Sequence, residues 1–146
     1  MYLRPDAFAV TSDTRRVHDP VQIFKDAVDA LNRLDREAML RLVDPDVAFV
    51  PMRSAVTGAY LGHTGLDDFL ADNADKYEYF LAEFDTLEML PDGRLLSIGR
   101  IRVRGLGGEA ETVVKTAGIA SFRGGRMLSW HDYGDEAVAR AKASER

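Results

Sequence analysis

The sequence contains no cysteine, which excludes disulfide bonds, thiolate metal ligands, cysteine nucleophiles and iron–sulfur clusters. No apolar run approaches the roughly 20 residues of a membrane span, so we expect no membrane partner. The first residues, Met1-Tyr2-Leu3-Arg4-Pro5-Asp6, lack the apolar core of a signal peptide, and the expected localisation is cytoplasmic. The three histidines are isolated and form no HxH or HxxxH pair, so we expect no bound metal. No cofactor is expected either.

Basic residues are outnumbered by acidic ones, 19 to 24. The net charge is −5 and the sequence pI is about 5.2, which argues against nucleic acid as a partner. Charge is distributed unevenly along the chain. Residues 19–92 carry sixteen acidic and six basic residues, whereas residues 94–126 carry two acidic and seven basic residues. This basic segment is either the solvated face of a sheet or the lining of a site for an anionic or oxygen-rich small molecule.

A chain of 146 residues, 46% of them hydrophobic, is typical of one globular domain with a sizeable core. Residues 1–18 show no clear hydrophobic period and are interpreted as an N-terminal extension. The remainder, residues 19–146, is predicted to form a single domain.

Helical patterns come first in this domain. Asp19-Pro20 predicts a helix start, and apolar residues then recur at helical spacing as far as Leu31. Asp35 is predicted to cap a second, shorter helix that ends before Asp44-Pro45-Asp46. Thr64 is predicted to cap a third helix that fades near Tyr77.

Strand patterns dominate the second half. Short strands are predicted at residues 47–50 and around 59–61, and longer strands at 80–90, 95–104, 111–123 and 126–133. A short helix at 136–143 follows Asp135. Because helices precede a meander of strands, the fold class is α+β, with a twisted sheet curled over the early helices around a cavity.

Several segments carry a family resemblance when they are taken in order. They are residues 34–38 (LDREA), 43–49 (VDPDVAF), 58–65 (GAYLGHTG), 122–127 (FRGGRM) and 130–135 (WHDYGD). Over roughly residues 19–143 the chain resembles the SnoaL-like branch of the nuclear transport factor 2-like superfamily. The resemblance implies a cone-shaped, cystatin-like architecture, in which a curved antiparallel or mixed sheet wraps about three N-terminal helices. It also implies a deep pocket and a homodimer formed through the outer sheet face.

Asp132 is the leading candidate for a catalytic residue. Alternation along the last strand places Leu128, Trp130 and Asp132 on one face. A carboxylate beside an indole on a concave wall is partly desolvated, which raises its pKa and suits proton transfer. Resemblance to the last strand of limonene epoxide hydrolases and to SnoaL-like polyketide cyclases implies an acid/base role. The alternative is a salt-bridged structural aspartate at a strand end.

Arg100 and Arg102 share a face of the strand at 95–104. By resemblance to the epoxide hydrolases, Arg100 matches a catalytic arginine, but Arg102 stands where their second acid lies. Hydrolysis by that mechanism is therefore not expected, since it needs two carboxylates. Arg100 is instead predicted to orient Asp132 as a second catalytic residue, and Arg102 to bind a carboxylate or phenolate. The alternative is a solvated basic stripe on the outer face.

Related chemistries fit less well. The positions that match the ketosteroid isomerase acid and base are Ala27 and Val50, and neither side chain can transfer a proton. Scytalone dehydratase-like chemistry needs paired histidines in the pocket, but alternation turns His131 away from Asp132. The remaining residues predicted to bind a ligand are Trp130, Phe49, Tyr60, His63, Tyr77 and Lys115. For His63 and Lys115 the alternative is simple exposure to solvent.

Two functions stay open. The first is a cofactor-independent acid/base enzyme, an isomerase, cyclase, dehydratase or hydrolase, acting on a small apolar oxygenated molecule. The second is a non-catalytic ligand-binding or dimerisation module of the same fold. The incomplete catalytic sets leave both open.

Overall fold

The computed structural model describes residues 19–52, 58–108 and 110–145. The predicted N-terminal extension, residues 1–18, lies outside the described residues. The elements in chain order are α2 (Pro20–Asn32), α3 (Arg36–Leu42), β1 (Val43–Val50), β2 (Tyr60–Leu61), α5 (Gly62–Lys76), β3 (Tyr77–Met89), β4 (Leu95–Gly105), β5 (Thr112–Arg123), β6 (Arg126–Asp132) and α6 (Glu136–Ala143).

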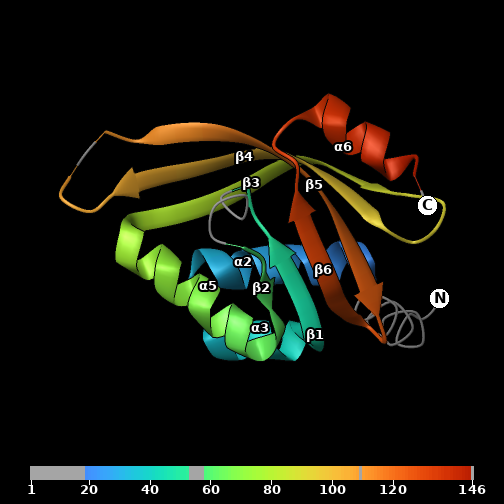
Figure 1. The fold of residues 1–146 in the computed structure, drawn as a ribbon, viewed down its shortest axis with the longest axis horizontal. Coiled ribbons are helices and arrows are strands. Elements are labelled where there is room, and N and C mark those ends of the chain that lie inside the picture. Colours follow the sequence, from blue (N-terminus) through green and yellow to red (C-terminus); the bar gives the residue numbers. More distant parts are fainter. Residues whose placement is uncertain (1–18, 53–57, 109, 146) are drawn as a thin grey trace, which may run out of the picture.

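The strands form one six-stranded sheet in the order β2-β1-β6-β5-β4-β3. Every neighbouring pair is antiparallel except β1 and β6, which run parallel. The sheet is strongly curved and does not close (Figure 1). Helices α2, α3 and α5 lie against what we call the inner face, and α6 lies on the outer face. The predicted α+β class, with a curved mixed sheet around three N-terminal helices, is confirmed.

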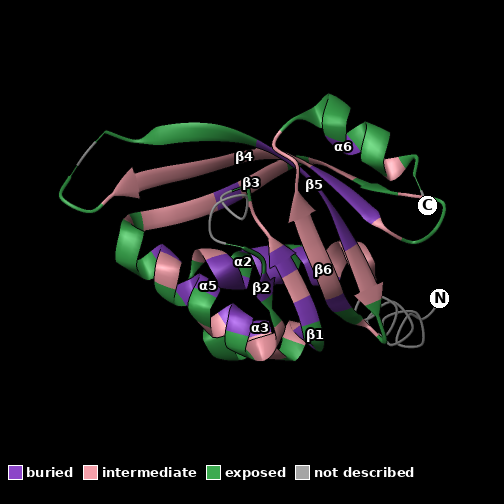
Figure 2. Cartoon of the chain, in the orientation of Figure 1, coloured by how far each residue is buried: buried purple, intermediate pink, exposed green. Residues whose placement is uncertain are grey.

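The main core lies between the inner face and the three helices α2, α3 and α5 (Figure 2). The apolar stripe of α2 is buried along its length, and Phe24 is fully buried at its centre. The Phe24 ring meets Trp130 of β6 at 5.2 Å and Phe84 of β3 at 5.1 Å, both edge-on. Burial of each such side chain contributes roughly 2 kcal/mol, so this packing fixes α2 against β6 in the middle of the sheet and against the edge strand β3.

A smaller apolar cluster lies on the outer face beneath α6. Ala139 of α6 is fully buried against Leu96, Ala117 and Ile119 of the sheet. Arg94 donates hydrogen bonds to the carbonyl of Ala143 at 2.8 Å and to that of Glu145 at 3.1 Å. These hydrogen bonds satisfy carbonyl groups that have no hydrogen-bond partner within the helix at its C-terminal end. The sheet is therefore covered on both faces near α6.

Local capping chemistry explains most helix starts. Asp19, Asp35 and Asp135 each accept a backbone N–H at the start of α2, α3 and α6, as the sequence predicts. The prediction for Thr64 is wrong, because α5 starts at Gly62 with no side-chain cap. Gly62 adopts a φ of +69°, which lets the chain turn from β2 directly into the helix.

Two strands start earlier than predicted. β1 starts at Val43, which already pairs with Met127 of β6. A register shift between Val43 and Ala48 accommodates Pro45, which a regular ladder does not tolerate. β3 starts at Tyr77, immediately after α5 ends at Lys76.

The alternation predicted for the last strand holds only beyond an irregularity. The register of β5 and β6 shifts between Ser121 and Phe122, and Met127 is thereby turned into the inner core, not onto the outer face. Further along, Trp130 packs inward, while His131 stacks on Tyr133 at 4.0 Å on the outer face. Asp132 follows on the same side as Trp130.

Candidate functional site

Asp132 ends β6 opposite Gly118 of β5. Its Oδ1 accepts the backbone N–H of Gly134 at 2.8 Å and that of Ala117 at 3.3 Å. The carboxylate thus replaces a backbone acceptor at the point where the β5–β6 ladder stops. This arrangement holds the aspartate in one orientation at the end of the inner face.

Burial raises the pKa of the Asp132 carboxyl above its ordinary value. The neighbouring Thr116 hydroxyl and the amides of Gly134 and Ala117 favour the charged form, but burial outweighs them. A carboxyl shifted in this direction exchanges protons closer to neutral pH, which is the property that general acid/base catalysis requires.

Trp130 lies beside Asp132 on the inner face, and its ring contacts Phe24 and Phe84. Its Nε1 is buried and has no hydrogen-bond partner in the described part of the chain. The Thr116 hydroxyl, on a residue that is only 1% exposed, hydrogen-bonds to the Asp132 carboxyl. Buried polar atoms are nearly always hydrogen-bonded in folded proteins, so the unsatisfied indole N–H of Trp130 is unusual.

Gly118 explains how these groups come together. A Cβ at this position would lie 3.0 Å from the Trp130 Nε1 and 2.8 Å from the carbonyl oxygen of His131. Because glycine has none, the indole lies directly over β5. Thr116, Trp130 and Asp132 therefore surround Gly118, and we call these four residues the inner polar patch. Sequence reasoning missed Thr116 and Gly118, although alternation along β5 places both on the face of Ala120.

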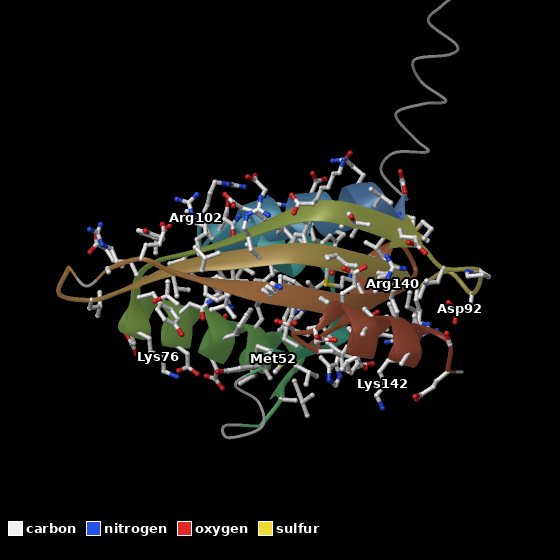
Figure 3. All side chains as sticks on the ribbon, turned by 90° about the horizontal axis from the view of Figure 1, so that it is seen from above. Met52, Lys76, Asp92, Arg102, Arg140 and Lys142 are labelled. Atoms are coloured by element: carbon white, nitrogen blue, oxygen red, sulfur yellow. The ribbon has the colours of Figure 1, made fainter. Side chains whose placement is uncertain are left out.

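Arg100 and Arg102 lie on the outer face. Arg100 forms ion pairs with Asp85 at 2.8 Å and Glu83 at 3.2 Å. The predicted pair of Arg100 with Asp132 is therefore not formed, because the two side chains leave the sheet on opposite faces. Figure 3 looks onto the outer face from the side of α6 and labels Arg102.

Arg102 is held in the same way. Its guanidinium pairs with Glu83 at 3.2 Å and with Glu111 at 3.1 Å, and Glu111 also accepts a hydrogen bond from Tyr79. These contacts keep the pKa of the Glu111 carboxyl below its ordinary value. We refer to Tyr79, Glu83, Asp85, Arg100, Arg102 and Glu111 as the outer ion-pair network. The basic stripe is the solvated alternative that the sequence left open.

Lys115 is the cross-strand neighbour of Arg100 and shares its face. Both residues line an outer cleft of about 460 Å³ between β4, β5 and the start of α6. Asp135 and Glu136 line its opposite wall. The three basic candidates thus lie apart from the inner polar patch.

Phe49 and Tyr77 belong to the inner aromatic core. Phe49 is 1% exposed, pairs with Trp130 in the β1–β6 register and stacks on Phe69 at 5.4 Å. The half-buried Tyr77 lies 5.9 Å from Phe80, measured between ring centroids. Phe49 therefore joins the core next to the patch.

Tyr60 and His63 lie near the β2 edge of the sheet. The Tyr60 hydroxyl donates a hydrogen bond to Asp72 of α5 at 2.5 Å. Tyr60 and Asp72 also line a surface cleft of about 480 Å³. The Nε2 of His63 lies 3.5 Å from the Val43 carbonyl oxygen. Both side chains anchor α5 to the first strands.

Within residues 19–52, 58–108 and 110–145, no three histidine or acidic side chains come together as a metal-binding group. None of the helices in these segments is long and apolar enough to cross a membrane.

No protein-family model matches the sequence, and no curated protein matches it. Many solved structures share its fold. One is TerC co-crystallised with polyporic acid, with 22% identity, a TM-score of 0.69, and coverage of 86% of this chain and 98% of the other. Another is a SnoaL-like polyketide cyclase, described as putative, from Shewanella denitrificans, with 16% identity, a TM-score of 0.66, and coverage of 85% and 96%.

A third is a protein with a ketosteroid isomerase-like fold from Catenulispora acidiphila, in complex with trimethylamine. It has 16% identity and a TM-score of 0.68, with coverage of 84% of this chain and 92% of the other. The nuclear transport factor 2-like fold that the sequence predicts is thereby confirmed. Likeness at this level of identity extends to the fold, and function has to be argued from the site.

Proposed function

We propose that this protein binds a small, mostly apolar molecule against the inner face of its sheet and exchanges a proton with it through Asp132. The observation that carries the proposal is the position of this carboxyl, which ends the inner face beside Trp130 and has its pKa raised by burial. The reaction class is acid/base chemistry without a cofactor, as in an isomerase, cyclase, dehydratase or hydrolase.

The proposal draws further support from structures of the same fold. One of them was crystallised with polyporic acid and another with trimethylamine, and both of these are small molecules. In this chain Asp132 acts alone, because Arg100 is bound to Asp85 and Glu83 on the other face.

A non-catalytic binding module is the second candidate. It is favoured by the two backbone amides bound to Oδ1, since a carboxylate that ends a strand in this way also has a structural use. In this case the ligand still occupies the inner face, but its protons are not exchanged.

Exchange of the α-protons of 2-indanone with D2O, followed by proton NMR, separates these candidates. This probe is a small neutral ketone whose exchange needs only a base. Wild-type protein is expected to accelerate the exchange, and Asp132→Asn to abolish that acceleration while retaining the Oδ1 acceptor. Asp135→Asn, on an aspartate that caps α6, is the matched control and should exchange as the wild type does. Equal rates with and without the wild-type protein would contradict catalysis by Asp132.

The protein is also proposed to form a homodimer through the outer face. α6 covers one part of that face, so the contact would use the remainder, where Val113 is 56% exposed beside the outer ion-pair network. An uncovered sheet face with an exposed valine and charges of both signs suits contact with a second copy of itself.

A further inference from the structure

Asp132 lies two residues before the glycine that leads into α6. The chain leaves the end of β6 at Asp132, turns at Tyr133 and Gly134, and begins α6 on the outer face at Glu136. Within this turn the Gly134 N–H donates a hydrogen bond to the Oδ1 of Asp132 at 2.8 Å. The carboxyl that we propose to transfer a proton is therefore bonded directly to the segment that carries α6.

Ala117 of β5 forms a second connection between Asp132 and α6. Its N–H donates to the same Oδ1 at 3.3 Å, and its carbonyl accepts the N–H of Tyr133 at 2.8 Å. On the outer face its side chain belongs to the apolar cluster in which Ala139 of α6 is fully buried. One residue thus binds the carboxyl through its backbone and forms part of the surface on which α6 rests.

The turn has little freedom to adopt another conformation. Gly134 has a φ of +78°, a region that residues with a side chain rarely adopt. A Cβ there would lie 3.1 Å from the Sδ of Met52, which follows the end of β1. Beyond the turn, Asp135 caps α6 by accepting the N–H of Val138 at 3.0 Å. Since only two residues join the end of β6 to this cap, the direction of the Gly134 N–H depends on where α6 lies.

α6 is too short to be stable without the sheet. It has eight residues, and isolated helices shorter than about 12 residues are marginal in water. Ala139 is its one buried residue. Its ion pairs, from Arg140 to Glu88 and to Glu136, lie on the surface, where such pairs contribute at most about 1 kcal/mol each. Ala139 is therefore the contact whose loss would release the helix most readily.

We infer that the docking of α6 positions Asp132, and that Gly134 and Ala139 are positioning residues for its proton transfer. This rests on the proposed function and adds an element of the outer face to a reaction on the inner face. The hydrogen bond from Gly134 favours the charged carboxylate, because an N–H donor stabilises a negative acceptor. Releasing α6 removes this bond but leaves the carboxyl covered, since Asp132 lies on the side of Trp130 and not of α6. Burial, which already opposes ionisation of Asp132, is then opposed by one donor fewer.

Other charged groups near this turn come from four elements. They are His131 of β6, Arg100 of β4, Lys115 of β5, and Asp135, Glu136 and Lys142 of α6. From α2 and β1 the neighbours of this end of β6 are Phe24 and Val50, which carry no charge. A positive charge on His131 favours the ionised form of Asp132. The titration of His131 therefore has to be followed separately from that of Asp132.

Carbon-13 NMR of the Asp132 carboxyl tests the inference directly and without a ligand. Its signal is the one that Asp132→Asn removes, and the ring protons of His131 are recorded in the same samples. Gly134→Ala forces the turn out of its positive φ, and Ala139→Leu pushes α6 away from the sheet. Each is expected to raise the pKa of Asp132 by about one pH unit. The pH profile of 2-indanone exchange should move to higher pH by the same amount.

Gly107→Ala and Ala141→Leu are the matched controls. Gly107 also has a positive φ, but it lies between β4 and β5 and an added Cβ meets nothing within 4 Å. Ala141 lies on the exposed side of α6. Both controls should leave the titration of Asp132 unchanged, even where the strain in Gly107→Ala lowers the thermal midpoint. A variant that loses stability without a change in this titration has lost only a structural contact.

An unchanged or lowered pKa of Asp132 in both Gly134→Ala and Ala139→Leu would overturn the inference, whatever the stability of the two variants. A shift in Gly134→Ala alone would overturn the role of α6, and a shift in Ala139→Leu alone would overturn the route through Gly134. If both titrations shift but the wild type does not accelerate 2-indanone exchange, α6 holds Asp132 and the proposed function fails. If exchange depends on Asp132 but neither titration shifts, the proposed function stands and this inference falls.

Discussion

At the scale of single residues, Asp132 combines two uses of one carboxyl group. Its Oδ1 accepts two backbone N–H groups where β6 ends, which is a structural task. Burial at the same time raises its pKa, which costs stability whenever the group is charged. A residue that only ended the strand would gain nothing from this burial, since an asparagine accepts the same two bonds without a charge.

The pH dependence of stability tests this cost. The folded-state pKa of Asp132 lies above its ordinary value of 3.8, so folding binds the proton more tightly. The contribution of Asp132 to stability is therefore fully present below pH 3.8 and is lost as the pH rises through the raised value. Relative to Asp132→Asn, the wild type should lose unfolding free energy over this interval in urea titrations. A difference between the two proteins that is constant with pH would contradict a raised pKa.

The candidate site could be predicted in part from strand alternation. Alternation correctly placed Trp130 and Asp132 together, because it depends only on neighbours in one strand. It correctly grouped Arg100 with Arg102, but it carries no information on which face the helices cover. The pair of Arg100 with Asp132 joined two strands whose relative faces are set by the whole sheet, and that pairing was wrong.

At the scale of elements, an ion-pair clamp joins β5 to the start of β1. Arg123 at the end of β5 donates to Asp44 at 2.7 Å and to Asp46 at 2.8 Å. The Asp44 side chain is only 11% exposed, and the pairing with Arg123 lowers its pKa below the ordinary value of 3.8. The clamp lies where Pro45 interrupts the ladder between β1 and β6, so it replaces contacts that the irregular strand lacks.

Asp44→Asn is expected to lower the thermal midpoint at neutral pH and to make it less sensitive to acid. Because the folded pKa of Asp44 is depressed, its contribution is present above pH 3.8 and is lost as the pH falls through the lowered value. The midpoints of the variant and the wild type should therefore converge in acid. Asp26→Asn, on the exposed side of α2, is the control and should change neither quantity. A midpoint of Asp44→Asn equal to that of the wild type at pH 7 would show that the clamp contributes nothing.

Gly99 of β4 marks a close approach between two strands. A Cβ there would collide with the carbonyl oxygen of Glu83 and lie 2.7 Å from the Cα of Phe84, where the β3–β4 register shifts. Both obstacles are backbone, so Gly99→Ala should destabilise the protein by about 2 kcal/mol in urea titrations. Ser97→Ala, two residues earlier on the same strand, also ends with an alanine but adds no Cβ and removes only a hydroxyl, so it should cost under about 1 kcal/mol. Equal costs for the two variants would argue against the close approach.

The helix starts that could be predicted from the sequence are those set by residues close together in the chain. The caps at Asp19, Asp35 and Asp135 depend on bonds within three residues, and all three form. The start of α5 and the face of Met127 depend instead on pairing with distant strands. These are the places where local reasoning erred, because a register shift is set by the partner strand and not by the residue itself.

At the scale of the whole molecule, the curved sheet separates two chemistries. Its inner face carries the aromatic core and ends at one carboxyl, whereas Arg100, Arg102 and Arg104 of β4 lie on the outer face. There they meet acidic partners from β3, so the uneven charge of the sequence is largely neutralised across neighbouring strands. Figure 3 shows the outer face with α6 lying across one part of it.

Because the two faces are separate, substitutions at exposed positions of the outer face can test the proposed homodimer with little effect on the inner face. Val113 and Val138 are 56% and 45% exposed, the first on the uncovered part of the outer face and the second on α6. Sedimentation at micromolar concentration should give a dimer for the wild type and for Val138→Asp. Val113→Asp should sediment as a monomer, because it adds an unpaired carboxylate to a self-complementary contact. Since the inner polar patch lies on the opposite face, a monomeric Val113→Asp should still bind 2-indanone. A wild-type monomer, or the same dimer in both variants, would place the contact elsewhere or remove it.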